Sequence, residues 1–184
     1  MTELLIFIGV IIVAIVGLAI ASYNKLIRLQ QNVTEAKSGI DVQMKRKANM
    51  LGNLLDAVKM QGEFEQSTMQ KIVEARAGLM SNDLETKMTA DVTASNLFKM
   101  VAEAYPTLGT NEGYKELMLG IKDVEDKVGY ARNRYNVAVV TYNTVQKTFP
   151  TMLFAGLANC SEEKVYELNR AEFEATDNMR IGNM

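Results

Sequence analysis

The chain has 184 residues, enough for one domain with an appendage, and carries a formal net charge of −2 with a pI near 5.4. This balance gives no general attraction to nucleic acid. The chain contains no histidine, which removes the commonest general base and the commonest metal ligand. A single cysteine, Cys160, excludes an internal disulfide. Only two prolines and as many as twelve methionines favour helix throughout.

The first predicted element is an uncharged apolar helix at residues 4–21, LLIFIGVIIVAIVGLAIA. It would extend about 27 Å, close to the roughly 30 Å hydrocarbon core of a bilayer. A secretory signal peptide is the alternative, because Ala19-Ile20-Ala21 resembles a cleavage site. However, the preceding MTE carries no Lys or Arg, and the apolar run exceeds a normal signal peptide core. We therefore predict a transmembrane anchor in residues 1–22, with lipid around residues 4–21.

Charges beside this segment predict its orientation. Lys25 and Arg28 follow it, whereas only Glu3 precedes it. Basic residues usually flank the cytoplasmic end of a membrane helix. We expect a single-pass protein of the inner or plasma membrane, with a short N-terminus outside and residues 22–184 in the cytoplasm.

Small residues along the anchor predict contact with another membrane helix. Such residues let two helix backbones approach closely in lipid. They are Ala14, Gly17 and Ala21. Together with the anchoring itself, they lead us to expect a homo-oligomer.

Apolar residues then recur at helical spacing. A first stripe runs through Val33, Ala36, Ile40, Met44, Ala48, Leu51, Leu55 and Val58, and a second through Met69, Val73, Ala77, Met80, Leu84 and Met88. We predict an all-α fold, in which the transmembrane helix precedes an elongated antiparallel bundle of three long helices and a short C-terminal helix. The bundle is assigned to residues 23–160, and the short helix and tail to residues 161–184.

The join between the first two bundle helices has two solutions. A turn near Gly62 gives helices of nearly equal length, and this is the solution we prefer. The alternative is a break near Asn82, which could form a capping box with Glu85.

A heptad pattern marks the third bundle helix, which we expect at residues 111–149. Apolar and aromatic residues seven apart predict a buried seam with left-handed packing against partner helices. The seam residues are Tyr114, Ile121, Val128, Tyr135, Tyr142 and Phe149. Asn136 and Asn143 follow two of the tyrosines, where asparagine is a poor helix former. They are either solvated residues or residues that form hydrogen bonds with an adjacent helix.

The segment after Pro150 is apolar and irregular. Met152, Leu153, Phe154 and Leu157 could cover the end of the bundle or contact lipid. We favour packing on the bundle because no basic cluster accompanies them. Ser161, followed by Glu162 and Glu163, predicts the start of the short last helix.

Several ordered blocks resemble the LemA family. The segment 23–59 is similar to that family's opening signature, the pair Ala75-Arg76 and the block AEAYP fit later steps, and RNRYNVAVVTYNTVQKTFP resembles its most recognisable block. The residues that match the opening signature are Ile40, Asp41, Val42, Gln43, Lys45, Arg46, Asn53 and Leu54. Gly52 stands where the family usually has proline, and Phe64 where it often has histidine.

The resemblance implies a membrane-anchored helical cytoplasmic domain without established catalysis. It also implies loose links to membrane protein quality control and to the building of magnetosome membranes. The residues agree, since the sequence has no phosphate-binding loop, nucleophile elbow or metal-ligand cluster. We therefore predict no enzyme activity, no cofactor, no metal site and no nucleic-acid partner.

Two functions remain open. The first is a scaffold that self-associates at the membrane and organises or shapes it. The second is an adaptor that presents its bundle to a membrane protease or another quality-control complex. Lys45, Arg46 and Lys47 form a basic block that is either a solvated helix face or a surface for an acidic partner.

Overall fold

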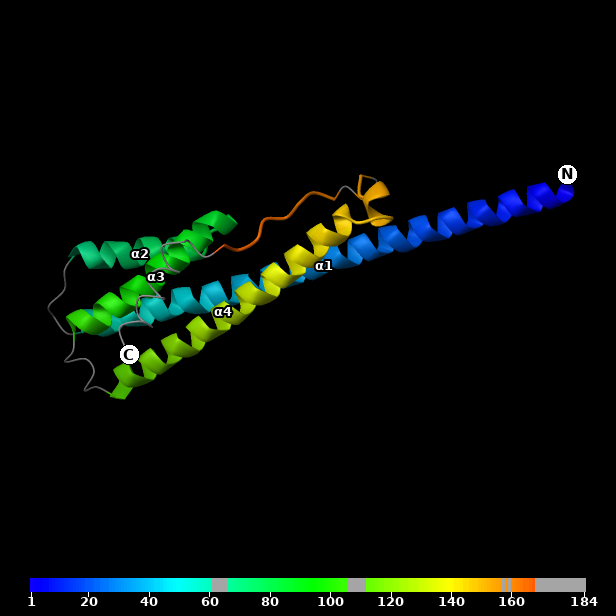
Figure 1. Ribbon diagram of the computed structural model, residues 1–184. Coiled ribbons are helices and arrows are strands. Elements are labelled where there is room, and N and C mark those ends of the chain that lie inside the picture. The colour runs from blue at the N-terminus through cyan, green and yellow to red at the C-terminus, as the bar shows by residue number, and fades with distance from the viewer. Residues whose placement is uncertain (61–65, 106–111, 157, 159, 168–184) are drawn as a thin grey trace, which may run out of the picture. The chain divides into compact units, whose positions relative to one another are not determined.

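A computed structural model describes residues 1–60, 66–105, 112–156, 158 and 160–167. Within these ranges the chain forms four α-helices and a short 3-10 helix, and it contains no strand (Figure 1). The elements are α1 (Thr2–Lys59), α2 (Gln66–Leu79), α3 (Leu84–Ala104), α4 (Glu112–Lys147) and η2 (Thr151–Leu153). The predicted all-helical class is confirmed.

The chain breaks at both places that the sequence offered as alternatives. α1 ends at Lys59 and α2 begins at Gln66, while the predicted turn residue Gly62 lies outside the described residues. A second break separates α2 from α3, so the predicted second long helix is two helices. Asp83, and not Asn82, caps α3: its backbone is extended, and its carboxylate accepts a 2.8 Å hydrogen bond from the Thr86 amide.

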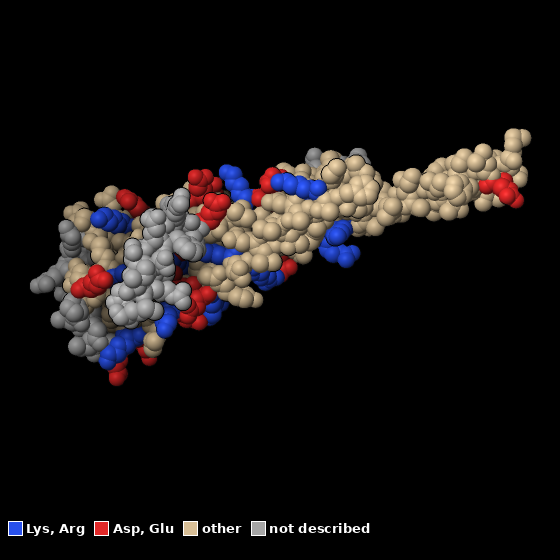
Figure 2. All heavy atoms as spheres, in the orientation of Figure 1, with Lys and Arg blue, Asp and Glu red and all other residues tan. Residues whose placement is uncertain are grey.

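α1 joins the apolar segment to the bundle without interruption. The most apolar 18-residue window of this helix is 0% buried, and it is the one described helix that is long and apolar enough to cross a membrane. In Figure 2 this part of α1, at the right, is free of charged side chains on the visible face up to the red carboxylate near the N-terminus. Burial begins directly after the segment, at Ser22 and Leu26.

The chain divides into two compact units, which are described separately. Unit 1 contains Met1–Ser38 and Arg134–Val165, and unit 2 contains Gly39–Asn133 and Tyr166–Met184. In unit 2, α2 packs closely on α3. A Cβ atom at Gly78 would lie only 2.6 Å from the Cβ of Ala90, so this approach of the two helices requires glycine.

The two predicted apolar stripes have different outcomes. Nearly all of the first is buried in α1, with Leu54 fully buried where we expected Leu55. The second was assigned to the wrong face, because Val73 and Met80 are exposed. The residues that α2 buries are Thr68, Ile72, Ala75 and Leu79. Within α2 the predicted stripe was placed one position too late, and it was also continued across the break at 80–83.

Candidate functional site

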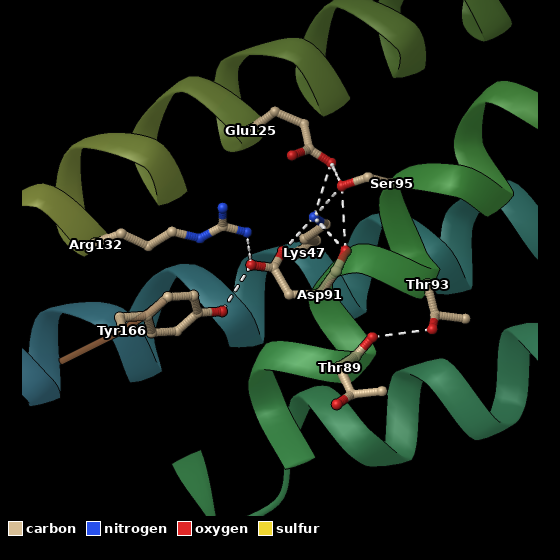
Figure 3. Close-up of polar contacts among 8 residues, drawn as sticks. All are labelled: Lys47, Thr89, Asp91, Thr93, Ser95, Glu125, Arg132 and Tyr166. Atoms are coloured by element: carbon tan, nitrogen blue, oxygen red, sulfur yellow. Dashed lines mark hydrogen bonds and ion pairs between the residues drawn. The ribbon is translucent and has the colours of Figure 1, made fainter. Parts of the chain in front are cut away.

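The most unusual feature of unit 2 is a set of buried polar side chains around Asp91. They come from α1, α3, α4 and the segment that follows η2 (Figure 3). Lys47 and Asp91 have side chains that are 0% exposed, which is rare for charged groups unless they are paired. We call the following residues the Asp91 cluster: Lys47, Asp91, Ser95, Glu125, Arg132 and Tyr166.

Oxygen atoms of Asp91, Ser95 and Glu125 surround the ammonium group of Lys47. Its Nζ forms an ion pair with Asp91 Oδ1 and donates to the Asp91 carbonyl at 3.0 Å. It also lies 2.8 Å from Ser95 Oγ and 2.9 Å from Glu125 Oε1. The Ser95 hydroxyl in turn donates to Glu125 Oε1 at 2.9 Å. One cation from α1 thus binds α3 and α4 together.

The second carboxylate oxygen of Asp91, Oδ2, also has a charged and a polar partner. Asp91 Oδ2 forms an ion pair with Arg132 and accepts a 2.9 Å hydrogen bond from the Tyr166 hydroxyl. The Arg132 guanidinium also lies over the Tyr166 ring, 5.0 Å from its centroid, which is a cation–π geometry. Within unit 2, Tyr166 therefore contacts both α3 and α4.

The cluster suits structure specification better than chemistry on a ligand. Its two cations, Lys47 and Arg132, are paired with two carboxylates inside the cluster. Among the described residues, no group of three or more His, Cys, Asp or Glu is placed to hold a metal ion. A buried ion pair allows few arrangements of the helices that carry it. If one helix shifts along the other, a buried charge loses its partner. We infer that the cluster fixes the helix register.

The prediction that Lys45, Arg46 and Lys47 form one basic surface is wrong for Lys47. Lys45 and Arg46 are exposed, as an interaction surface requires, but Lys47 is fully buried. The sequence held a signal for this position, because Lys47 stands three residues after Met44 and four before Leu51, within the buried stripe of α1. Asp91 likewise stands three residues before the buried Ala94.

The tyrosine seam is buried over most of its predicted length. The structure buries Tyr114, Ile121, Val128, Tyr135 and Tyr142. Phe149 is 72% exposed, because α4 ends two residues earlier at Lys147, and its assignment to the seam is wrong. The companion series also shifts, since Val139 is fully buried instead of Ala138.

Burial changes the acidity of the seam tyrosines. It raises the pKa of Tyr114, of Tyr135 and most of all of Tyr142, where the nearby Cys160 thiol and Glu163 add to the effect. The Tyr135 hydroxyl donates to the Lys164 carbonyl at 2.9 Å. Among the described residues, the hydroxyls of Tyr114 and Tyr142 have no hydrogen-bond partner of normal geometry.

Asn143 makes a polar contact, but with an extended segment and not with a helix. Its Nδ2 donates to the Glu163 carbonyl at 2.8 Å, and its Oδ1 accepts from the Glu163 amide at 3.1 Å. Gln146 adds a 2.8 Å bond to the Cys160 carbonyl. These side chains satisfy backbone groups of Cys160 and Glu163, in the segment that turns back after η2 (Figure 1). Asn136, the other predicted polar residue, is half-buried on α4.

The predicted C-terminal helix is absent from the described part of its range, residues 161–167. Residues 161–167 have no regular secondary structure, so the start assigned to Ser161 is wrong, and residues 168–184 lie outside the described residues. The side chains of α4 account for the difference, because they supply the hydrogen bonds that a helix would make internally.

An apolar tip follows α4 in unit 1. We define it as Phe149, Met152 and Leu153, which are 72%, 53% and 60% exposed. The prediction that Met152 and Leu153 pack on the bundle is therefore wrong. Phe154 is half-buried, and Leu157 lies outside the described residues.

Contact between the small residues of the anchor and a second membrane helix remains a prediction. Ala14, Gly17 and Ala21 lie exposed on α1, and a Cβ atom at Gly17 would meet nothing within 4 Å. A second helix could therefore approach this face closely.

Comparisons with known proteins identify a family profile and several relatives that resemble this chain. The sequence profile of the LemA family matches residues 36–179. The chain is 25% identical over 163 residues to Protein LemA of Metamycoplasma hominis, covering 86% of this chain and 71% of that protein. It is 24% identical over 162 residues to Magnetosome protein MamQ 2 of Paramagnetospirillum magneticum, covering 72% of this chain and 60% of that protein. It is also 23% identical over 169 residues to Magnetosome protein MamQ of Magnetospirillum gryphiswaldense, covering 76% and 62%.

Proposed function

The chain belongs to the LemA family, and we propose that it is a membrane-anchored helical scaffold that self-associates at the membrane and organises or shapes it. The single observation that carries this proposal is α1. One helix supplies both the exposed apolar segment and the buried stripe of the bundle. Within unit 1, the anchor continues as one helix into the packed residues up to Ser38, so it links these residues directly to the membrane, and this is what a scaffold requires.

Self-association follows from three features of the anchored chain. The small face of α1 permits close helix contact in lipid. Val137 and Val140 are exposed on the part of α4 in unit 1, and they offer apolar area for lateral contact. Anchoring also raises the effective concentration of such contacts. Two relatives named as magnetosome proteins support a role at a membrane, although this chain spans only 60% and 62% of their lengths.

We expect the purified full-length chain to form assemblies much larger than its 20.5 kDa monomer. Light scattering after size exclusion in a mild detergent measures the protein mass, with the detergent contribution subtracted. Gly17→Leu should shift the distribution toward the monomer, because a large side chain separates helices that pack on the small face. Val16→Leu, an apolar change on the other side of the helix, is the matched control. A monomer at all concentrations would contradict the scaffold, and a monomer with a co-purifying protease or other membrane protein would favour an adaptor.

The proposed orientation gives a separate prediction. A protease added to sealed, right-side-out cells should leave residues 22–184 intact, because Lys25 and Arg28 are expected on the cytoplasmic side. Immunoblotting against the bundle reads the result, and permeabilised cells show that the protease can cut it. Loss of the bundle in sealed cells would reverse the orientation.

A further inference from the structure

The structure points to a second membrane contact, and we propose that the apolar tip inserts into the interfacial layer of the bilayer that α1 crosses. This rests on the proposed membrane anchoring and adds a lipid-binding surface to it. The tip is the only part of the described segment 148–156 that is both strongly exposed and apolar, and residues 148–161 contain no charged side chain. An exposed, uncharged apolar surface of this kind fits the boundary between headgroups and acyl chains.

The direction of α4 in unit 1 places its end near the membrane. Arg134, the first residue of α4 in this unit, forms an ion pair with Glu35 on α1. The part of α1 in unit 1 ends at Ser38, and its buried residues Leu26 and Val33 precede Glu35. Figure 1 shows the rest of α4 running beside α1 toward the N-terminal end of that helix. The two helices therefore run antiparallel there, and α4 approaches the apolar segment as it nears its C-terminal end.

The depth of the tip relative to the membrane can be derived because α1 and α4 rise by the same distance per residue. From Arg134, α4 continues to Lys147. An equal stretch of α1, counted back from Glu35, ends at Ser22, the residue directly after the apolar segment 4–21. The burial of Ser22 and Leu26 agrees with this level, since both lie just beyond a segment in which no residue is buried.

The turn after α4 keeps the tip beside the helix end. The Met152 amide donates to the Thr148 carbonyl at 2.9 Å, and the Leu153 amide donates to the Pro150 carbonyl at 3.2 Å. The apolar segment is slightly shorter than a hydrocarbon core of about 30 Å, which draws the residues after it toward the headgroups. Phe149, Met152 and Leu153 then reach the interfacial layer, while the exposed Lys25 and Arg28 can meet anionic headgroups.

A second lipid contact at the tip would prevent rotation about the axis of α1, which α1 alone cannot prevent. A single helix leaves unit 1 free to rotate about the helix axis, whereas a second contact away from that axis fixes which face of unit 1 is turned to neighbouring copies. The tip thereby gives a self-associating scaffold a defined orientation.

The test uses the full-length chain in vesicles of phosphatidylcholine and phosphatidylglycerol, with and without brominated acyl chains. In a Cys160→Ser background, single cysteines at Met152, Val13 and Lys37 carry a fluorophore. Val13 lies in the apolar segment. Lys37 lies on α1 about 24 Å beyond Ala21, the last residue of that segment. Circular dichroism confirms that each variant is folded.

We expect bromine quenching at Met152 to reach roughly half or more of that at Val13, as for a side chain inserted some 5–10 Å into the interface, with little quenching at Lys37. Quenching at Met152 no stronger than at Lys37, with Val13 quenched, would overturn the tip contact and leave the anchor standing. The absence of quenching at Val13 as well would refute the anchor itself. Protection of Met152 from aqueous iodide without bromine quenching would show that protein covers the tip, and this also overturns the proposal.

Discussion

Replacing Asp91 by asparagine should lower the free energy of unfolding by about 3 to 5 kcal/mol, the cost of breaking a buried ion pair. The substitution keeps the size and shape of the side chain but removes its charge. Lys47 would then remain fully buried with its charge poorly compensated, and Arg132 would lose its carboxylate partner. Denaturant unfolding of the full-length chain in detergent, followed by circular dichroism, measures the change.

An exposed ion pair in unit 2 provides the matched control. Asp123 pairs with Lys127 one turn further along α4, at 2.6 Å, and both side chains are about half exposed. Asp123→Asn should cost less than about 0.5 kcal/mol, because water already solvates both charges. A loss below about 1 kcal/mol for Asp91→Asn would contradict the role assigned to the cluster.

A double-mutant cycle separates the pair from the rest of the cluster. Lys47→Met replaces the buried ammonium by an apolar chain of similar length. If the two residues act as a pair, the loss caused by Lys47→Met should be smaller in the Asp91→Asn background than in the natural sequence. Strict additivity would show that each residue is held by its other partners.

Lys47 also shows why the fold was easier to predict than the site. The apolar spacing of residues 33–58 identified a buried helix face, and the structure buries nearly all of it. The same spacing places Lys47 on that face, but its neighbours Lys45 and Arg46 made the three look like one basic surface. What stabilises a buried lysine is a carboxylate distant in the sequence, here Asp91 on α3. Periodicity within one helix carries no information about such a partner.

Local signals at the helix ends were similarly incomplete. The segment SNDLE was correctly identified as a candidate helix start, but two acceptors stand side by side there, and the backbone conformation selects Asp83. After α4, the pattern of Ser161, Glu162 and Glu163 resembles a helix start. Asn143 and Gln146 instead bind the backbone of this segment in an extended form. These tertiary hydrogen bonds outweigh a local preference that is worth about 1 kcal/mol.

Replacing Tyr142 by alanine should lower the free energy of unfolding by about 3 to 5 kcal/mol, because the ring is fully buried and its removal leaves a cavity in unit 1. Tyr142→Phe should change it by less than about 1 kcal/mol. The hydroxyl has no partner of normal geometry among the described residues, so the substitution removes a desolvated polar group and no strong hydrogen bond. The contrast between the two variants assigns the effect of Tyr142 to packing.

Tyr135 supplies the opposite case on the same helix face. Its ring is equally buried, but its hydroxyl donates to the Lys164 carbonyl at 2.9 Å. Tyr135→Phe should therefore cost about 1 kcal/mol or more, since it leaves that carbonyl without its donor. The exposed Tyr130, changed to alanine, should stay within about 0.5 kcal/mol and controls for the loss of a tyrosine from α4. If the two phenylalanine variants lost equal stability, the Tyr142 hydroxyl would be hydrogen-bonded as well, with the neighbouring Cys160 thiol as the candidate partner. If Tyr142→Ala cost less than about 1 kcal/mol, the ring could not be part of the core, and the heptad seam would end before it.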